Sequence, residues 1–266
     1  MTVPENPPII TLTTDFGPGG PYAAAVKGVF RAHCPSAVVD ELSHDIAPWD
    51  LTGAALFLEG ALPWYPPGCI HVVVVDPGVG TGRRPVVVSA GGSLLVGPDN
   101  GIFSLLLRRI GFDGAWVIEQ CPLFPEKISP TFHGRDLFAP AAAWLARGNP
   151  PESLGSSAGD LVQLEMPYPV VGAEGDLSGK VVHVDRFGNC ITNISSEVFT
   201  GGRVRVETRG GLLELPFCQT YGDAPRGTAL ALIGSGGRLE VAVREGNASA
   251  VLGIGGGTAV VVYPNP

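Results

Sequence analysis

The sequence predicts an α/β N-terminal domain with a largely parallel sheet, followed by a smaller all-β, barrel-like C-terminal domain. Three observations support this fold class. Apolar runs alternate with helix-like segments from residue 9 to about residue 150, which is typical of an α/β layer. Residues 179–266 contain short strand-like runs separated by Gly-rich turns. The 38 Gly and 25 Pro favour short elements and exclude a long helical bundle.

Each element of the N-terminal half has its own local signal. Pro21 suits the first turn of a helix, and Gly111 and Gly148 follow apolar helical segments and end them. The run IHVVVVD is apolar without alternation, as expected of a parallel strand covered on both faces. Strands are predicted at residues 9–13, 37–42, 70–76, 85–90, 93–98 and 115–119. Helices are predicted at residues 21–34, 50–60, 100–111 and 136–148.

A change in composition marks the domain boundary. Residues 150–178 are rich in Pro, Gly and Ser, which is typical of a connecting segment. We therefore predict an N-terminal domain at residues 1–165, a linker at 166–178 and the all-β domain at 179–266. Strands of that domain are predicted at residues 180–185, 191–195, 203–208, 211–216, 229–234, 238–244 and 258–263.

Charge and cysteine content exclude several classes of protein. The chain has 17 Lys and Arg against 25 Asp and Glu, so its net charge of −8 argues against binding nucleic acid or an anionic membrane. Its five cysteines are widely spaced and include no CxxC, which fits neither a disulfide framework nor a zinc–cysteine site.

No apolar run approaches the roughly 18 residues of a membrane span, and no signal peptide is visible. We expect a cytoplasmic protein without a bound metal.

The strongest candidate site lies at the carboxyl ends of the first strands. Asp76 closes the strand at 70–76, and ligands of open α/β sheets bind at this edge. Arg83, which follows in the Gly-rich loop DPGVGTGRR, can fold back to pair with Asp76. Asp15 closes the first strand and lies at the same edge. The alternative interpretation is structural, with Asp76 capping its turn and Asp15 forming an Asx-turn.

Two further segments carry groups that can do chemistry. His133 and Asp136 lie in TFHGRD just before a helix, where His133 is a candidate functional group or a plain surface residue, and Asp136 suits the helix dipole. In the C-terminal half, DRFGN places Phe187 beside the polar groups of Asp185 and Asn189, between two strands. This segment suits a purine base or, alternatively, is a simple hairpin turn.

Several motifs occur in an order that resembles a known family. TTDFG, LSHDI, VVDPGVGTGRR, LLVGPDNG, TFHGRDLFAP, DRFGNCITNI and GSGGRLEVAV lie along roughly residues 9–262. In these motifs the chain resembles the S-adenosyl-L-methionine (SAM) hydroxide adenosyltransferase family, the adenosine-forming SAM hydrolases related to bacterial fluorinase and chlorinase. The resemblance implies an N-terminal α/β domain, a β-barrel-like C-terminal domain and a homotrimer with active sites at subunit interfaces. It implies SAM as substrate and no cofactor.

The resemblance also implies a role for particular residues. Asp76, Arg83 and His133 match the water-activating triad, and Asp15 matches the carboxylate that binds the ribose diol. Matching substrate positions in the C-terminal domain are Phe187 and Asn189 in the adenine pocket, Tyr221 near the base, Asn247 and Ala248 at the adenine edge, and Asp185 and Ser235 at the methionine end. The chain departs from the halogenating relatives at Gly20, where they carry an acidic residue, and at Gly236, where the fluorinase carries Arg.

The implied reaction is hydrolysis of SAM to adenosine and L-methionine by attack of water or hydroxide at C5′. If the base that acts on water has the pKa of an ordinary His, kcat should rise between about pH 6 and 8. Two alternatives remain open. The first is a 5′-halogenating SAM-dependent enzyme, although the charge of Asp76 would repel a halide. The second is a non-catalytic module that binds SAM or a nucleoside.

Overall fold

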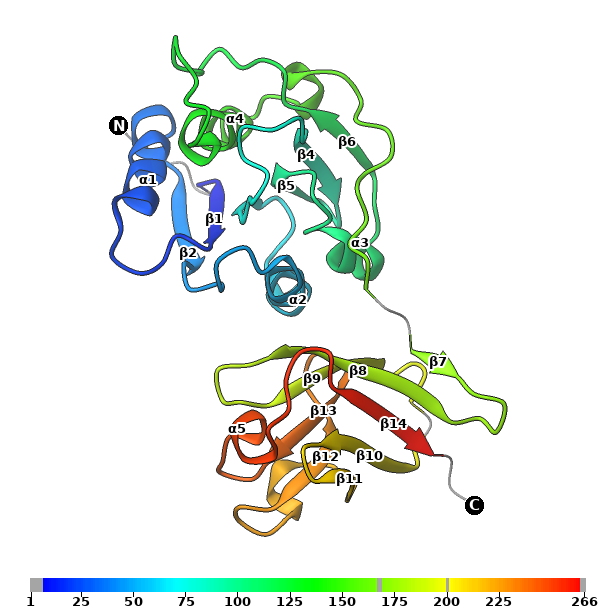
Figure 1. Ribbon diagram of the computed structural model, residues 1–266. Coiled ribbons are helices and arrows are strands. Elements are labelled where there is room, and N and C mark those ends of the chain that lie inside the picture. Colours follow the sequence, from blue (N-terminus) through cyan, green and yellow to red (C-terminus); the bar gives the residue numbers. More distant parts are fainter. Residues whose placement is uncertain (1–6, 167–168, 200, 264–266) are drawn as a thin grey trace. The chain divides into compact units, whose positions relative to one another are not determined.

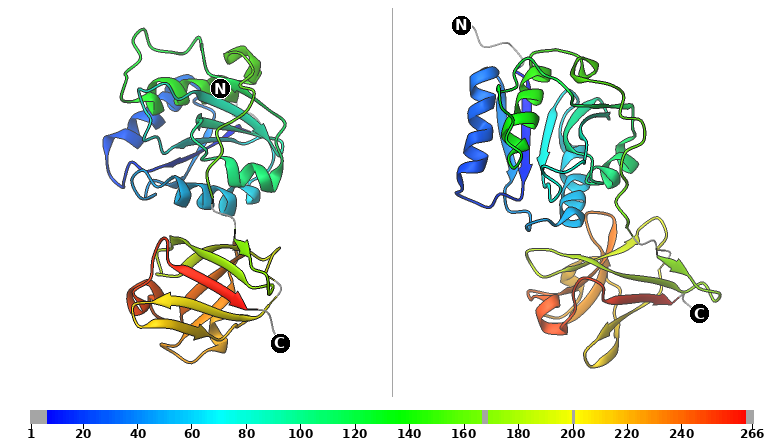
Figure 2. Two further views of the ribbon diagram at one scale, coloured as in Figure 1. Left: turned by 45° about the vertical axis from the view of Figure 1, so that its right-hand side comes forward. Right: turned by 45° about the horizontal axis from the view of Figure 1, so that its top comes forward.

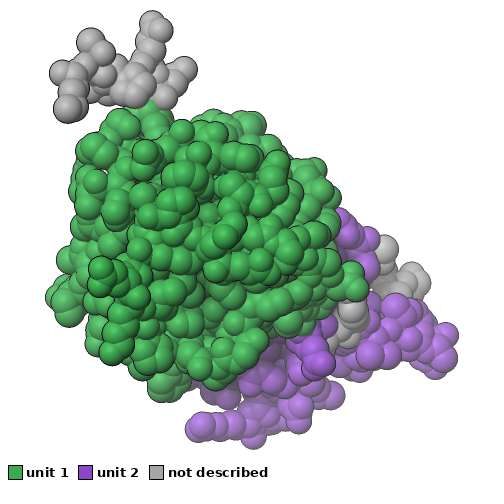
Figure 3. Space-filling view, turned by 90° about the horizontal axis from the view of Figure 1, so that it is seen from above, with its two compact units in different colours: residues 1–164 green, residues 165–266 purple. Residues whose placement is uncertain are grey.

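The chain forms two compact units, residues 1–164 and 165–266, coloured separately in Figure 3. The computed structural model describes residues 7–166, 169–199 and 201–263. Within the segment predicted as a linker, the structure places the short strand β7 (Val170–Val171), which pairs antiparallel with the first residues of β8 (Leu177–Val184). Positions 167–168 of that segment lie outside the described residues.

The N-terminal unit is built on a six-stranded sheet with the order β2-β1-β3-β5-β4-β6 (Figure 1). The strands are β1 (Ile9–Thr14), β2 (Val38–Ser43), β3 (Ile70–Val74), β4 (Pro85–Ala90), β5 (Ser93–Pro98) and β6 (Gly114–Val117). Strands β2, β1, β3 and β5 run parallel, whereas β4 is antiparallel to both β5 and β6. The predicted α/β fold with a largely parallel sheet is confirmed.

The reversal of β4 follows from the two-residue turn that joins it to β5. Gly91 and Gly92 both have positive φ, at 57° and 76°, which a two-residue hairpin turn of this kind requires. Pro85 at the start of β4 is therefore level with Pro98 at the end of β5. Because β5 is parallel to β3, the residues just before β4 lie at the same edge of the sheet as the residues just after β3.

Helices cover both faces of this sheet (Figures 1 and 2). They are α1 (Pro21–His33), α2 (Leu51–Ala61), α3 (Ser104–Ile110) and α4 (Ala139–Ala146). Alternate residues of β3 pack into different cores: Val72 and Val74 join the core that contains α1 and α4. Val73 joins the core that contains α2 and α3. β3 is therefore buried on both sides, as its unbroken apolar run predicts.

Two helices begin two or more residues away from the predicted position. The helix predicted from residue 100 begins at Ser104, because Gly101 has a φ of 90° and the Asn100 side chain accepts a hydrogen bond from the Ile102 N–H, which holds a turn there. The helix predicted from residue 136 begins earlier, with a π-helical turn at Gly134–Phe138 that runs into α4. Pro140 has no N–H, and the wider turn leaves room for its ring.

The C-terminal unit is all-β and barrel-like, as predicted (Figure 2). Its antiparallel, nearly closed sheet has the order β11-β10-β14-β8-β9-β13-β12. Its remaining strands are β9 (Cys190–Ser195), β10 (Arg203–Thr208), β11 (Gly211–Leu215), β12 (Ala229–Ile233), β13 (Arg238–Val243) and β14 (Ala259–Tyr263). The segment after β11 approaches β12, because Ala231 N–H donates to the Pro216 carbonyl and Cys218 N–H donates to the Ala231 carbonyl. One short helix, α5 (Ala248–Leu252), follows β13.

Candidate functional site

Two carboxylates follow neighbouring parallel strands of the N-terminal sheet. Thr14, at the end of β1, is level with Val74, at the end of β3. Asp15 follows Thr14 directly, and Asp76 comes two residues after Val74. The structure thus places both predicted carboxylates at the carboxyl edge of the sheet, where ligands of open α/β sheets bind.

Arg83 contacts both other members of the predicted triad. Its Nε donates to both carboxylate oxygens of Asp76 at 3.0 Å, and its Nη2 also donates to Oδ2. The same Nη2 donates to Nδ1 of His133 at 2.7 Å. The Arg83 and Asp76 side chains are 9% and 5% exposed, so this ion pair is well shielded from water. Arg83 reaches this edge because β4 runs antiparallel and starts there.

The loop between Asp76 and Arg83 is shaped for close contact with the segment before His133. Gly80 has a φ of 76°, a conformation that side-chain-bearing residues rarely adopt. A Cβ at Gly80 would lie 2.4 Å from the carbonyl oxygen of Pro130. Asp136 holds the other end of that segment by accepting a hydrogen bond from the Ser129 N–H at 2.8 Å. Together these contacts bring His133 to Arg83.

His133 is held in its neutral form. A guanidinium only donates hydrogen bonds, so Nδ1 of His133 accepts from Arg83 and we assign the ring proton to Nε2. Burial lowers the pKa of His133 below its ordinary value, and the positive charge of Arg83 lowers it further, against smaller opposing effects of Asp76 and Asp136. His133 therefore presents an Nε2–H donor at neutral pH.

One donor of this group has no partner. Nη1 of Arg83 is buried and makes no hydrogen bond within the described residues. A buried donor without a partner costs roughly 1–3 kcal/mol, so stability alone does not explain this guanidinium. This free Nη1 can therefore donate a hydrogen bond to a group that enters the site.

Asp15 has a neighbour that the sequence analysis did not single out. The Asp15 carboxylate accepts a hydrogen bond from the Trp49 N–H at 3.0 Å. Trp49 has a φ of 64°, which is strained for an aromatic residue, and 74% of its surface is exposed. Nothing in the local sequence around Trp49 indicates this contact, which joins segments 34 residues apart.

The C-terminal unit gathers a second group of predicted residues at the β8–β9 turn. Asp185 Oδ1 accepts hydrogen bonds from the backbone N–H groups of Phe187 and Asn189, and Asn189 Nδ2 donates to Asp185 Oδ2 at 3.0 Å. Phe187 projects from this turn with 77% of its surface exposed. The hairpin-turn interpretation is thus structurally correct, and it leaves the Phe187 ring free to contact a ligand.

The segment at the start of α5 packs against the same turn. A Cβ at Gly188 would lie within 2.1 Å of the Asn247 side chain, so only glycine fits there. The Ser249 N–H donates to the Gly188 carbonyl at 3.0 Å, and Asn247 caps α5 by accepting from the Ala250 N–H. Ala248, the first residue of α5, is fully buried. The structure therefore brings Asn247 and Ala248 to the Asp185–Asn189 turn.

Tyr221 contacts a buried carboxylate that the sequence analysis missed. The Tyr221 hydroxyl donates to Glu240 Oε2 at 3.0 Å, and a Cβ at Gly234 would touch Glu240 Oε1. Burial raises the pKa of Glu240, and the nearby charge of Asp185 raises it further, while the Tyr221 hydrogen bond opposes both. Burial and Glu240 in turn raise the pKa of Tyr221. Ser235 lies exposed in the β12–β13 turn beside Gly234.

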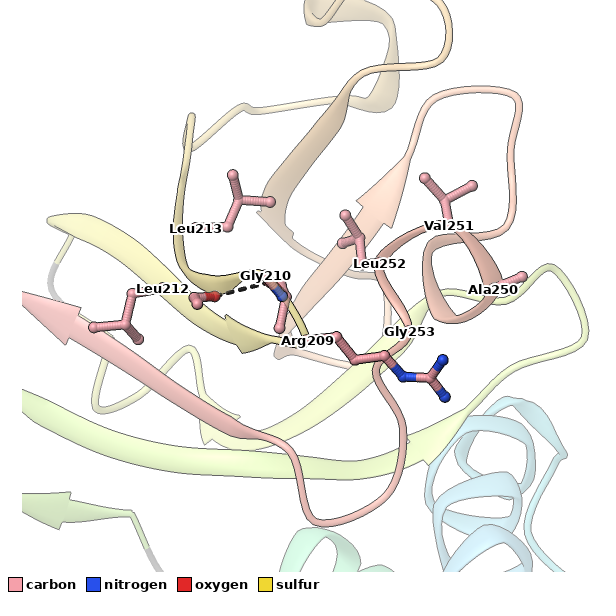
Figure 4. Close-up of a pocket in the computed structure, with 10 residues that line it drawn as sticks. Arg209, Gly210, Leu212, Leu213, Ala250, Val251, Leu252 and Gly253 are labelled. Carbon is pink, nitrogen blue, oxygen red and sulfur yellow. Dashed lines mark hydrogen bonds between the residues drawn. The ribbon is translucent and has the colours of Figure 1, made fainter.

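Other features of the described residues do not add to this site. A groove of about 490 Å³ lies between the β10–β11 turn and α5 and includes Arg209, Leu212 and Val251, but none of the predicted substrate residues lines it (Figure 4). The described part of the chain contains no group of three or more His, Cys, Asp or Glu that could hold a metal ion. Within the same residue ranges, every helix is too short or too polar to cross a bilayer.

Comparison with known proteins identifies the family. The sequence profile of the SAM hydroxide adenosyltransferase N-terminal domain matches residues 10–155, and that of the C-terminal domain matches residues 179–261. The chain belongs to the SAM hydroxide adenosyltransferase family. Each matched domain contains one of the two residue groups described above.

Relatives of this member of the family span nearly its whole length. An (R)-S-adenosyl-L-methionine hydrolase from Thermus thermophilus is 42% identical, with 93% of this chain and 96% of the relative covered. The enzyme of the same name from Salinispora arenicola is 36% identical, with 93% and 94% covered. A solved structure of a conserved protein from Thermotoga maritima has a TM-score of 0.87 at 34% identity and covers 96% of this chain and 100% of its own.

Halogenating relatives are more distant from this member of the family. A fluorinase from Nocardia brasiliensis is 29% identical, with 88% of this chain and 90% of the fluorinase covered. The similarity therefore favours the hydrolases over the fluorinases.

Proposed function

We propose that this chain hydrolyses SAM to adenosine and L-methionine. The observation that carries the proposal is the arrangement of Arg83, which binds the carboxylate of Asp76 and the imidazole of His133 through one guanidinium group at the ligand-binding edge of the sheet. The relatives named as SAM hydrolases support the same reaction.

The proposed reaction is an in-line displacement at C5′ of SAM. A water oxygen forms a bond to C5′ while the C5′–S bond breaks, and its electron pair returns to sulfur. The leaving group is the neutral thioether of methionine, so no acid is needed to protonate it. Asp76 accepts the proton that the attacking water loses, and the Nε2–H of His133 orients the water oxygen. Arg83 fixes both groups through its hydrogen bonds.

The remaining predicted residues are proposed to hold the substrate. Asp15 binds the two ribose hydroxyls, and the exposed Phe187 ring stacks on adenine beside the Asn189 amide. Tyr221, Asn247 and Ala248 complete the adenine surroundings, and Asp185 and Ser235 bind the methionine part. The clustering of Asp185, Asn189, Asn247 and Ala248 around one turn supports this assignment.

Incubation of the purified protein with SAM tests the reaction. Formation of adenosine and L-methionine in equal amounts is the expected result. Release of 5′-haloadenosine in the presence of halide would identify a halogenating enzyme instead, and binding of SAM without turnover would identify a binding module. Because the relatives carry the (R) designation, we expect the (R)-sulfonium epimer to be consumed before the (S) epimer.

Three further properties belong to this proposal. The chemistry needs no cofactor, because the substrate already carries its leaving group and water is the second reactant. All five cysteines are free thiols, which is typical of the reducing cytoplasm. We also propose a homotrimer, for which light scattering should give three times 27.5 kDa, about 82 kDa.

A further inference from the structure

A chain of polar side chains ends at the turn that carries Asp15. Thr14 Oγ1 lies 2.8 Å from Nδ1 of His44, and Nε2 of His44 lies 2.8 Å from Glu41 Oε2. Lys27 pairs with the other oxygen of Glu41 at 2.8 Å. None of these four residues has a role in the proposed reaction, although His44 belongs to the LSHDI motif.

The direction of these hydrogen bonds follows from the groups involved. A carboxylate only accepts, so Nε2 of His44 carries a proton and donates it to Glu41. Thr14 is fully buried, and its oxygen already accepts a hydrogen bond from the Phe16 N–H at 3.2 Å. The Thr14 hydroxyl hydrogen therefore needs an acceptor, and Nδ1 of His44 supplies it.

The backbone on both sides of Asp15 is fixed by the same segment. Thr14 and Phe16, its two neighbours, are tied to His44 through the Thr14 hydroxyl. The Gly17 N–H donates to the His44 carbonyl at 2.8 Å. The Asp15 carboxylate itself accepts from the Trp49 N–H. Of these contacts, only the Thr14–His44 bond joins two side chains and can be removed by substitution without altering the main chain.

We propose that His44 is a positioning residue that, through the Thr14 hydroxyl, holds Asp15 in the geometry that recognises the ribose diol. The inference rests on the proposed function, because it takes Asp15 as the ribose-binding group. His44 itself touches no substrate atom. It fixes the orientation of the Asp15 carboxylate. Its loss affects selection of the nucleoside sugar rather than attack of water at C5′.

The test compares affinities for adenosine and 2′-deoxyadenosine by calorimetry. In the wild type, the deoxy compound should bind at least about tenfold more weakly. In His44→Ala this ratio should fall close to one, with a higher KM for SAM and a kcat that changes much less. Thr14→Val should behave in the same way, and Thr14→Ser should retain the wild-type ratio. Affinity for L-methionine serves as the internal control and should not change.

Two matched variants separate positioning from loss of fold. The Asn amide oxygen lies near the place of Nδ1, so His44→Asn should restore the ratio, whereas His44→Gln preserves only the contact with Glu41 and should not. If His44 has a merely structural role, the affinity ratio of each variant should instead change in step with its thermal stability. A wild-type ratio in a folded His44→Ala protein overturns the proposal. Equal affinities of the wild type for adenosine and 2′-deoxyadenosine overturn the proposal as well, because Asp15 then does not recognise the ribose diol. SAM hydrolysis is still supported in that case if the protein forms adenosine from SAM.

Discussion

Nη2 of Arg83 donates a hydrogen bond to Nδ1 of His133, which leaves the imidazole neutral with its proton on Nε2. This relationship changes the expected role of the histidine. An imidazole whose accepting nitrogen is occupied is a donor to the attacking water, and the carboxylate of Asp76 is the group left to accept a proton.

His133→Ala should lower kcat by about 10²–10⁴ and leave the Kd for SAM within a few fold, because the residue acts on water and not on the substrate. His133→Asn retains an acceptor for Arg83 but loses the Nε2–H, so it should be nearly as slow. Single-turnover kinetics and calorimetry measure the two quantities separately. A fully active His133→Ala protein that no longer binds SAM would show that His133 is a binding residue.

The pH dependence of kcat should have its acid limb below pH 6.5. Burial and Arg83 lower the pKa of His133 from the ordinary 6.5, and the neutral form is the active one. The midpoint of this limb therefore lies below pH 6.5, and activity falls as the pH drops through the lowered pKa. The rise between pH 6 and 8 expected from an ordinary histidine moves to lower pH. The stability that His133 contributes while neutral should also be lost as pH falls below 6.5.

Replacing Asp15 should weaken adenosine binding and remove its sugar selectivity. In Asp15→Asn the ribose hydroxyls lose a charged acceptor, and adenosine affinity should fall by about tenfold or more. The affinity for 2′-deoxyadenosine, which lacks one of those hydroxyls, should change less. Calorimetry with both nucleosides measures the difference. An unchanged adenosine affinity would exclude Asp15 from the ribose site.

Gly80→Ala should lower the free energy of unfolding and lower kcat. An Ala at positive φ costs roughly 1–2 kcal/mol, and its Cβ would also collide with the Pro130 carbonyl. Gly82→Ala is the matched control, since nothing lies within 4 Å of a Cβ there. Chemical denaturation gives the stability, and the kcat of each variant shows whether His133 has moved. Equal effects of the two substitutions would contradict this account of the loop.

Glu240→Gln should flatten the pH dependence of stability. The folded-state pKa of Glu240 is raised above the ordinary 4.5, so its contribution to stability is present below pH 4.5 and is lost as pH rises through the raised value. The amide does not titrate, and the variant should be at least as stable as the wild type at neutral pH. Denaturation at several pH values measures this. The prediction fails if the difference in stability between the variant and the wild type is the same at pH 4 and at pH 7.

Local sequence patterns were sufficient to predict most helices and strands. They did not predict which distant segments contact each other. The apolar run around β3 and the Gly-rich turns of the second unit predicted both architectures, because each signal lies within a few residues. The π-helical turn depends on how Pro140 fits a helix that has already begun. The position of Asp76, Arg83 and His133 as neighbours depends on Gly80 packing against Pro130, fifty residues along the chain.

Glu240 illustrates the same limit in the second unit. In RLEVAV it alternates with apolar residues as a surface position would. Its burial arises only when Tyr221 and Gly234 pack over it, and neither lies within the strand. The positive φ of Trp49 and its hydrogen bond to Asp15, 34 residues earlier in the chain, were likewise not predicted from the sequence.

The Gly91–Gly92 turn is a suitable place to attach a tag to this protein. It precedes β5 and so lies at the amino edge of the parallel strands, opposite to the edge that carries Asp15 and Asp76. Both glycines are exposed. A short peptide tag inserted between them would attach the protein to a surface at the edge of the sheet opposite to its reacting groups.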